Sequence, residues 1–186
     1  NLMYMRFKNR YNRSFIYKSN NIMRVLRLFE HSYNCGFKNR RMTERCLEIS
    51  IARYWLEKNK EKFKDCKNMY FKQSNAIVDN LPNVDLILCR DLIIHFPIDK
   101  IWELLNNFLK SGSEYLLITK DNKNIDVNPD NKFGSYGAYR NLEKYPFNFP
   151  KPIFTILDKD MNGYSASLVL YKIQNLRSFI NNHFKR

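Results

Sequence analysis

Two residues capable of proton transfer follow the most apolar run of the sequence. Val84 to Cys89 is almost continuously apolar, and Asp91 and His95 come shortly after it. An imidazole is the usual general base near neutral pH, and a carboxylate can orient it or a substrate. Four residues apart, both side chains would share one face of a helix that began where the run ends. The alternative is structural, with Asp91 capping a turn and His95 packing against the next helix.

A second group of polar residues lies in the long segment from Asp121 to Lys151, which is rich in aromatic residues. Arg140, Asn141 and Asn148 stand there among tyrosines and phenylalanines. Polar groups fixed among aromatic rings are what a substrate-binding lid requires, and long segments of this kind are usually functional. We therefore expect these three residues to bind substrate. The alternative is that residues 146–150 seal the edge of a sheet.

The four cysteines and three histidines favour neither a metal site nor a disulfide framework. No two cysteines are two residues apart, and the histidines do not cluster with them. A chain of 186 residues can build a core without disulfides. We predict no metal, reduced thiols and an intracellular, cytoplasmic location. Charged residues interrupt the longest apolar stretch, 84–96, so we predict no membrane span.

The elements that must position these residues follow from hydrophobic periodicity. We predict strands at 46–51, 68–74, 84–89, 114–120, 152–157 and 166–173, and helices at 21–31, 53–64 and 97–109. Residues 84–120 form a strand, helix and strand, which implies a right-handed crossover in a parallel sheet. The last two strands, joined by a short polar link, indicate an antiparallel hairpin.

Positive charge is concentrated in the N-terminal part of the chain. The net charge is +14, and residues 1–72 hold 18 Lys/Arg against 6 Asp/Glu. A basic segment is suited to binding nucleic acid, and the alternative is a solvated surface.

Three ordered motifs resemble the class I S-adenosylmethionine-dependent methyltransferases. Leu81 to Asp91, followed by His95, is similar to the fourth strand of a bacterial and viral subgroup, which has the pattern LPxxDLILCRD. Lys110 to Thr119 is similar to the fifth strand. The loop of that subgroup is matched by Asn124 to Asp126, Arg140 to Leu142 and Pro146 to Pro150. The resemblance extends from about Cys46 to Ile173.

The resemblance implies an α/β fold with a Rossmann-like, mostly parallel sheet, a C-terminal antiparallel hairpin and helices on both faces. It implies S-adenosylmethionine as methyl donor and an unidentified acceptor. By the same resemblance, Glu48 would hold the ribose hydroxyls, Asn75 the adenine amino group, and Cys89 would lie beside the sulfonium. We expect the domain at 46–175, between a basic segment, 1–45, and a basic tail, 176–186.

The sequence departs from this family before Glu48. The first strand and its glycine-rich turn are expected 15–25 residues earlier, but residues 1–111 contain one glycine, Gly36. Glycine lets the backbone approach a cofactor without a Cβ clash. We therefore expect a divergent, truncated or frame-shifted N-terminal part. Two alternative hypotheses follow: a non-catalytic methyltransferase-like protein that binds RNA or an assembly through this segment, and an inactive gene fragment.

Overall fold

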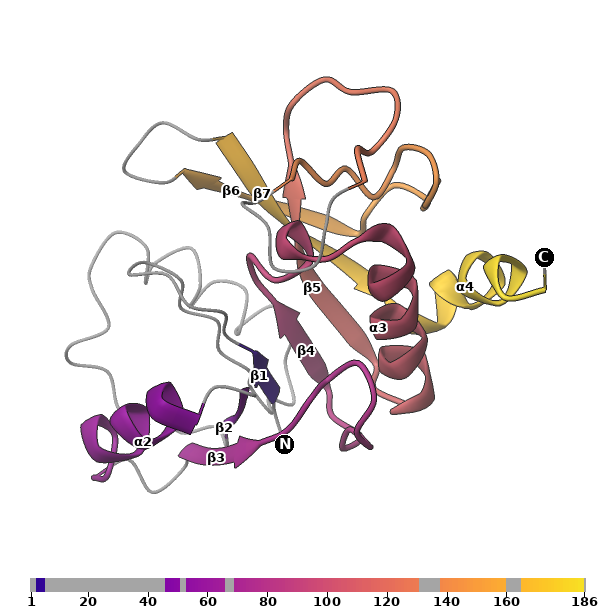
Figure 1. Ribbon diagram of the computed structural model, residues 1–186. Helices are drawn as coiled ribbons and strands as arrows, with labels where there is room; N and C mark the ends of the chain where they lie inside the picture. Colours follow the sequence, from indigo (N-terminus) through magenta and orange to yellow (C-terminus); the bar gives the residue numbers. More distant parts are fainter. Residues whose placement is uncertain are drawn as a thin grey trace.

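The computed structural model describes residues 3–5, 46–50, 53–65, 69–130, 138–159 and 165–185. It contains a seven-stranded sheet in the order β3-β2-β1-β4-β5-β7-β6 (Figure 1). The strands are β1 (Met3–Met5), β2 (Cys46–Ser50), β3 (Met69–Gln73), β4 (Leu86–Cys89), β5 (Tyr115–Asp121), β6 (Phe154–Lys159) and β7 (Ser165–Lys172). The predicted helix at 21–31 lies outside the described residues.

The sheet is parallel in its centre and antiparallel at one edge. β1 pairs in parallel with both β2 and β4, and the β2–β3 and β4–β5 pairs are also parallel. β7 runs antiparallel to β5 and to β6, which confirms the C-terminal hairpin. The six strands predicted from periodicity correspond to β2 through β7, with ends that differ by at most two residues.

The first strand lies much earlier than the 15–25 residues before Glu48 that we expected. β1 is formed by Met3–Met5, and its Tyr4 is in register with Glu48 of β2 and Leu88 of β4. Residues 3–5 therefore belong to the sheet, and the predicted domain boundary at residue 46 is wrong. Most of the basic segment, 6–45, lies outside the described residues, so its binding to nucleic acid stays a prediction.

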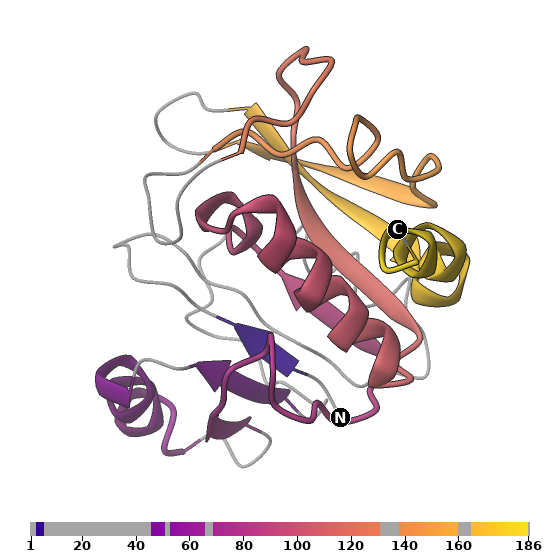
Figure 2. The same cartoon turned by 45° about the vertical axis from the view of Figure 1, so that its right-hand side comes forward.

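Two helices connect parallel strands on opposite sides of β1. α2 (Arg53–Lys62) links β2 to β3, and α3 (Ile98–Lys110) links β4 to β5. The two connections step outward in opposite directions, so right-handed crossovers put their helices on opposite faces of the sheet. α3 lies along β4 and β5, as Figures 1 and 2 show.

The sequence of α3 explains its position. Its stripe of buried residues is Ile101, Trp102, Leu104, Leu105, Phe108 and Leu109. Pro97 is the N-terminal capping residue, and Asp99 lies in the first turn, where a carboxylate complements the helix dipole. The backbone N–H of Ile98 donates to Asp130 Oδ1 at 2.9 Å, so the loop after β5 caps the helix. These contacts confirm Trp102 as a core residue and fix α3 against the sheet.

The C-terminal residues are part of the core, which corrects the prediction of a separate tail. A 3₁₀ turn, η3 (Ile173–Leu176), leads into α4 (Arg177–His183), and α4 lies beside α3 (Figure 2). Leu176 and Ile180 are each 1% exposed. None of the helices in the part of the chain that the structure describes is long and apolar enough to cross a membrane.

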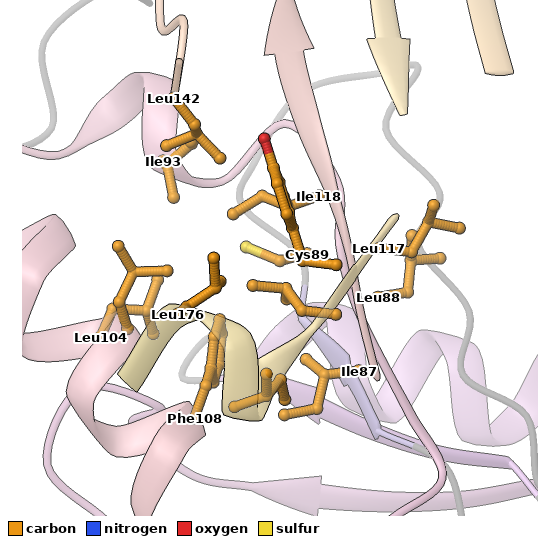
Figure 3. Packing of buried hydrophobic residues seen from close by; sticks show 14 of the residues in the cluster. Ile87, Leu88, Cys89, Ile93, Leu104, Phe108, Leu117, Ile118, Leu142 and Leu176 are labelled. Atoms are coloured by element: carbon orange, nitrogen blue, oxygen red, sulfur yellow. The ribbon is translucent and has the colours of Figure 1, made fainter. Parts of the chain in front are cut away.

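The core surrounds β4, which is buried on both faces as its continuous apolar run predicted. All four of its residues are at most 1% exposed. Cys89 and Ile118 lie on the side that faces Leu104 of α3, whereas Leu88 and Leu117 point the other way (Figure 3). Because β4 is packed on both faces, the position of its last residue, Cys89, is fixed, and so is the point from which the following residues leave the sheet.

Candidate functional site

The carboxyl end of β4 is the centre of the candidate site. In open parallel sheets, ligands bind beyond the carboxyl ends of the strands where the strand order reverses. Here the order reverses at β1 and β4, because the chain continues to β2 and β3 on one side and to β5 on the other. The residues that come directly after Cys89 therefore lie at the switch point, which is where Asp91 and His95 were predicted to act.

Asp91 has an unusual backbone conformation and a defined set of partners. Its φ is 52°, in the left-handed region that few residues other than glycine adopt. Its N–H donates to Thr119 Oγ1 at 2.8 Å, and the Thr119 hydroxyl lies 3.3 Å from Asp91 Oδ1. Arg90 Nε lies 3.7 Å from Asp91 Oδ2, so a cation also faces the carboxylate. The carboxylate is thus held close to the end of β5.

His95 lies in a short 3₁₀ turn, η2 (Ile93–His95), and is half-buried. The helix that follows begins only at Ile98, so Asp91 and His95 do not share the face of one helix as the four-residue spacing suggested. Asp91 has a left-handed backbone, whereas His95 lies in a 3₁₀ turn, so the chain between them is not a regular helix. They remain on the same connection between β4 and α3, and both stay candidates for proton transfer.

Arg140 has a structural role, which corrects its prediction as a substrate-binding residue. Its side chain is 0% exposed, and its guanidinium donates to the carbonyls of Phe96, at 2.7 Å, and Tyr139, at 3.1 Å, as well as Pro129. Burial lowers the pKa of Arg140. Because the buried guanidinium group bonds backbone carbonyls in both segments, it holds the long loop against the η2 turn.

The β5–β6 loop is further ordered by a buried asparagine that the sequence analysis missed. Asn128 is 2% exposed, and its side-chain amide donates to the carbonyls of Asn141, at 2.8 Å, and Tyr145, at 2.9 Å. Its Oδ1 accepts the N–H of Asn141 at 2.7 Å. No periodicity marks a single buried amide in a polar segment, so only the folded loop identifies it.

Asn141 and Asn148 differ in what their side chains can reach. Asn141 is buried, and its Oδ1 accepts the N–H of Glu143 at 3.1 Å, so it also belongs to the internal structure of the loop. That it binds substrate stays a prediction. Asn148 is exposed and has a φ of 49°, a conformation that asparagine tolerates better than most residues. Of the three predicted substrate-binding residues, Asn148 alone presents its side chain to solvent.

Within residues 146–150, the two phenylalanines pack into the core, whereas Asn148 and Pro150 are exposed. Phe147 and Phe149 are buried, and their ring centroids lie 5.1 Å and 6.0 Å from that of Trp102. Phe149 also contacts Tyr171 of β7, at 5.9 Å between centroids. The two pairs that Phe149 makes, with Trp102 and with Tyr171, are edge-to-face, an arrangement that stabilises a packed cluster. Phe147 and Phe149 therefore hold the last part of the loop between α3 and β7.

Glu48 lies two residues before the end of β2, and its side chain lies outside the described part of the chain. Asn75 follows β3 in a single helical turn. Its Oδ1 accepts the N–H of Ile77 at 3.1 Å, and its N–H donates to Asp79 Oδ2 at 2.8 Å. These bonds order the turn and leave Asn75 exposed, with one lone pair of its carbonyl oxygen for another donor.

The turn after β3 is attached to α3. Asn107 of α3 donates its side-chain amide to the carbonyls of Ala76 and Asp79, both at 2.8 Å. The backbone N–H of Asn75 and the Ser74 hydroxyl bond the Asp79 carboxylate and hold its pKa below its ordinary value. The position predicted to meet an adenine is therefore preformed.

The Cys89 thiol is buried in the core, and Figure 3 shows it among apolar side chains. Burial, and secondarily Asp91, raises its pKa, so the thiol stays protonated and is no nucleophile. Its predicted proximity to the cofactor can thus involve only its backbone. Among the described residues, no group of His, Cys, Asp and Glu could hold a metal ion.

Comparison with known proteins identifies the fold. No protein-family model and no curated protein match the sequence. Magnesium protoporphyrin IX methyltransferase from Synechocystis PCC 6803, solved with bound S-adenosylhomocysteine, superimposes with a TM-score of 0.50 at 12% identity, covering 67% of this chain and 62% of that one. N-methyltransferase NodS from Bradyrhizobium japonicum WM9, in complex with the same ligand, gives a TM-score of 0.51 at 8% identity, covering 68% and 65%.

The chain spans less than two thirds of the length of either structure. At these levels of identity, what the superpositions show is a shared fold. The chain has the fold of the class I S-adenosylmethionine-dependent methyltransferases.

Proposed function

We propose that the protein binds S-adenosylmethionine at the carboxyl end of β4 and transfers its methyl group to an acceptor. The observation that carries this proposal is the switch point at β1 and β4, with the left-handed Asp91 directly beyond it. The two solved structures compared above contain S-adenosylhomocysteine. A fixed, non-glycine residue in a strained conformation is a feature that proteins retain mainly at functional sites.

The residues around the switch point fit the chemical groups of this cofactor. Glu48 on β2 would accept hydrogen bonds from the ribose hydroxyls, and Asn75 after β3 would accept one from the adenine amino group. The backbone from Cys89 to Asp91 would face the sulfonium. The bound cofactor would supply an activated methyl group, which an acceptor with a lone pair takes up as the sulfur–carbon bond breaks.

The protein's own contribution to this reaction would be alignment and proton removal. Placing the acceptor in line with the methyl group supplies much of the rate in a direct transfer. Asp91 and His95 lie on the connection that borders the site, where either could accept the proton that the acceptor loses. Asn148, exposed on the fixed β5–β6 loop, is our candidate for contact with the acceptor.

Calorimetric titration with S-adenosylhomocysteine tests the proposal. We expect micromolar binding, which corresponds to about −8 kcal/mol. Replacing Glu48 by Gln should weaken this binding about tenfold, because a charged acceptor is lost from the ribose hydroxyls. Glu114→Gln is the matched control, because Glu114 is exposed at the opposite end of β5 beside Lys172. No binding by the unmodified protein at millimolar ligand would contradict the proposed function.

A further inference from the structure

The left-handed conformation of Asp91 needs a cause within the fold. Asparagine, aspartate and glycine visit this region, but for an L-residue it is disfavoured unless the surroundings impose it. Asp91 follows a strand whose four residues are all buried, so the chain must leave β4 at a fixed point. The contacts of Asp91 with β5 show what holds the residue there.

Thr119 makes the contacts that define the Asp91 conformation. Cys89 is in register with Ile118, so Thr119 extends one residue beyond that pair on β5, beside the point where the chain leaves β4. Its side chain is 1% exposed. The single hydroxyl accepts the backbone N–H of Asp91 at 2.8 Å and lies 3.3 Å from Asp91 Oδ1, to which it donates.

We infer that Thr119 is a positioning residue for the proposed methyl-transfer site. Its hydroxyl bonds both the main chain and the carboxylate of Asp91, which sets the direction of the backbone from Arg90 to Asp91 at the switch point. This inference rests on the proposed function. A valine at this position would keep the branched shape and the burial in β5, but it would offer no acceptor to the N–H and no donor to the carboxylate.

Ligand affinity tests the consequence of this positioning. We expect Thr119→Val to weaken S-adenosylhomocysteine binding about tenfold in calorimetry, and Thr119→Ser to restore it to near the unmodified value. Ser167→Ala is the matched control. It removes another buried hydroxyl at the same edge, which bonds Asn122 Oδ1 at 2.9 Å and not Asp91. Unchanged affinity in Thr119→Val, or an equal loss in Ser167→Ala, would overturn the inference while leaving the proposed function intact.

Amide hydrogen exchange of Asp91, followed by NMR, tests the positioning without any ligand. The Asp91 N–H should be protected in the unmodified protein and in Ser167→Ala. In Thr119→Val it should exchange at least about tenfold faster, because its buried acceptor is gone. The same protection in Thr119→Val would overturn the inference. If valine prevents folding, Thr119→Ala replaces it. If the unmodified protein binds no S-adenosylhomocysteine, the proposed function fails, and the functional part of the inference fails with it.

Discussion

Individual buried polar groups decide how the candidate site is built. Thr119, Asn128 and Arg140 are each at most 2% exposed, and each bonds backbone from another part of the chain. Because an unsatisfied buried polar group costs free energy, such residues specify one arrangement of the loops around them. Asn148, by contrast, is exposed and is our candidate for contact with the acceptor.

Arg140→Met should destabilise the protein by about 3 kcal/mol, because several backbone carbonyls lose a buried charged donor. Arg177→Met is the control. Arg177 is exposed, and its Nε donates to Gln174 Oε1 at 2.6 Å, so its loss should cost less than about 1 kcal/mol. Urea denaturation of both variants measures the difference. Equal losses would show that Arg140 does not hold the β5–β6 loop.

Cys89 makes stability depend on pH in the alkaline range. The pKa of its thiol in the folded state is raised above the ordinary 9.0. The thiol therefore contributes fully to the free energy of unfolding below pH 9, and this contribution is lost as the pH rises further. Burial also raises the pKa of Tyr171 above its ordinary 10.0, so the contribution of Tyr171 to stability is likewise lost as the pH rises above 10. Replacing Cys89 by Ala lowers the free energy of unfolding through lost packing, by an amount that does not depend on pH. It also removes the pH dependence that ionisation of the thiol causes.

The unfolding free energies of the unmodified protein and of Cys89→Ala should therefore differ by a constant amount below pH 8. Above pH 9 the difference should shrink by at most about 1.4 kcal/mol per pH unit. Urea denaturation at pH 7, 8, 9 and 10 measures it. A difference that stays constant to pH 10 would mean that the thiol ionises in the folded protein as easily as in the unfolded one.

Among the secondary-structure elements, α3 connects most parts of the site. Its buried stripe covers β4 and β5, Asp130 caps its first turn, and Asn107 bonds the turn after β3. α4 adds a second layer beside it, in which His183 stacks on Trp102 with 4.4 Å between ring centroids. The helix that links β4 to β5 therefore also joins the proposed adenine side to the proposed acceptor side.

Ile180→Ala should cost about 3 kcal/mol if α4 is part of the core, since it removes a side chain that is 1% exposed. Phe184→Ala removes a larger apolar side chain from the same C-terminal region, but Phe184 is 50% exposed, so the loss should be under about 1 kcal/mol. Thermal unfolding compares the two. A small effect of Ile180→Ala would show that α4 contributes little to the core, as expected for a C-terminal tail outside the domain.

At the scale of the whole molecule, β1 unites the two halves of the sheet. It pairs with β2 on one side and with β4 on the other, so the β2–β3 half joins the β4–β7 half through three residues. The proposed cofactor site needs both halves, because Glu48 belongs to one and Asp91 to the other. The proposed ligand binding therefore requires an intact β1.

Tyr4→Pro should destabilise the protein by about 3 kcal/mol or more and abolish S-adenosylhomocysteine binding, because proline removes a backbone donor from a central strand. Tyr4→Val also removes the tyrosine side chain but keeps the backbone N–H, so it separates the two effects. Circular dichroism melting and calorimetry measure both variants. Equal behaviour of the two would show that β1 does not join the halves through its backbone.

The sequence by itself determined the elements whose pattern is local. The apolar run before Arg90, the stripe of α3 and the two hairpin strands with their short polar link were predicted because each pattern is complete within a few consecutive residues. The motif that ends at Asp91 and His95 is also contiguous, and its resemblance to a known family led to the prediction of a site at the end of β4. These features depend on period and spacing, which a linear sequence displays directly.

Tertiary structure alone decided which of the polar residues face inward. Asp91 bonds Thr119, 28 residues away in the chain, and Arg140 bonds Phe96, 44 residues away, and no local pattern encodes such distances. Arg140 and Asn141 are residue types that often bind ligands, but both are buried and bond the backbone around them. β1 is short, far from β2 in sequence, and defined by pairing on both sides. The place of Asp91 just after β4 was thus predicted from sequence, whereas its left-handed conformation and its bonds to Thr119 follow from the packing of β4 against β5.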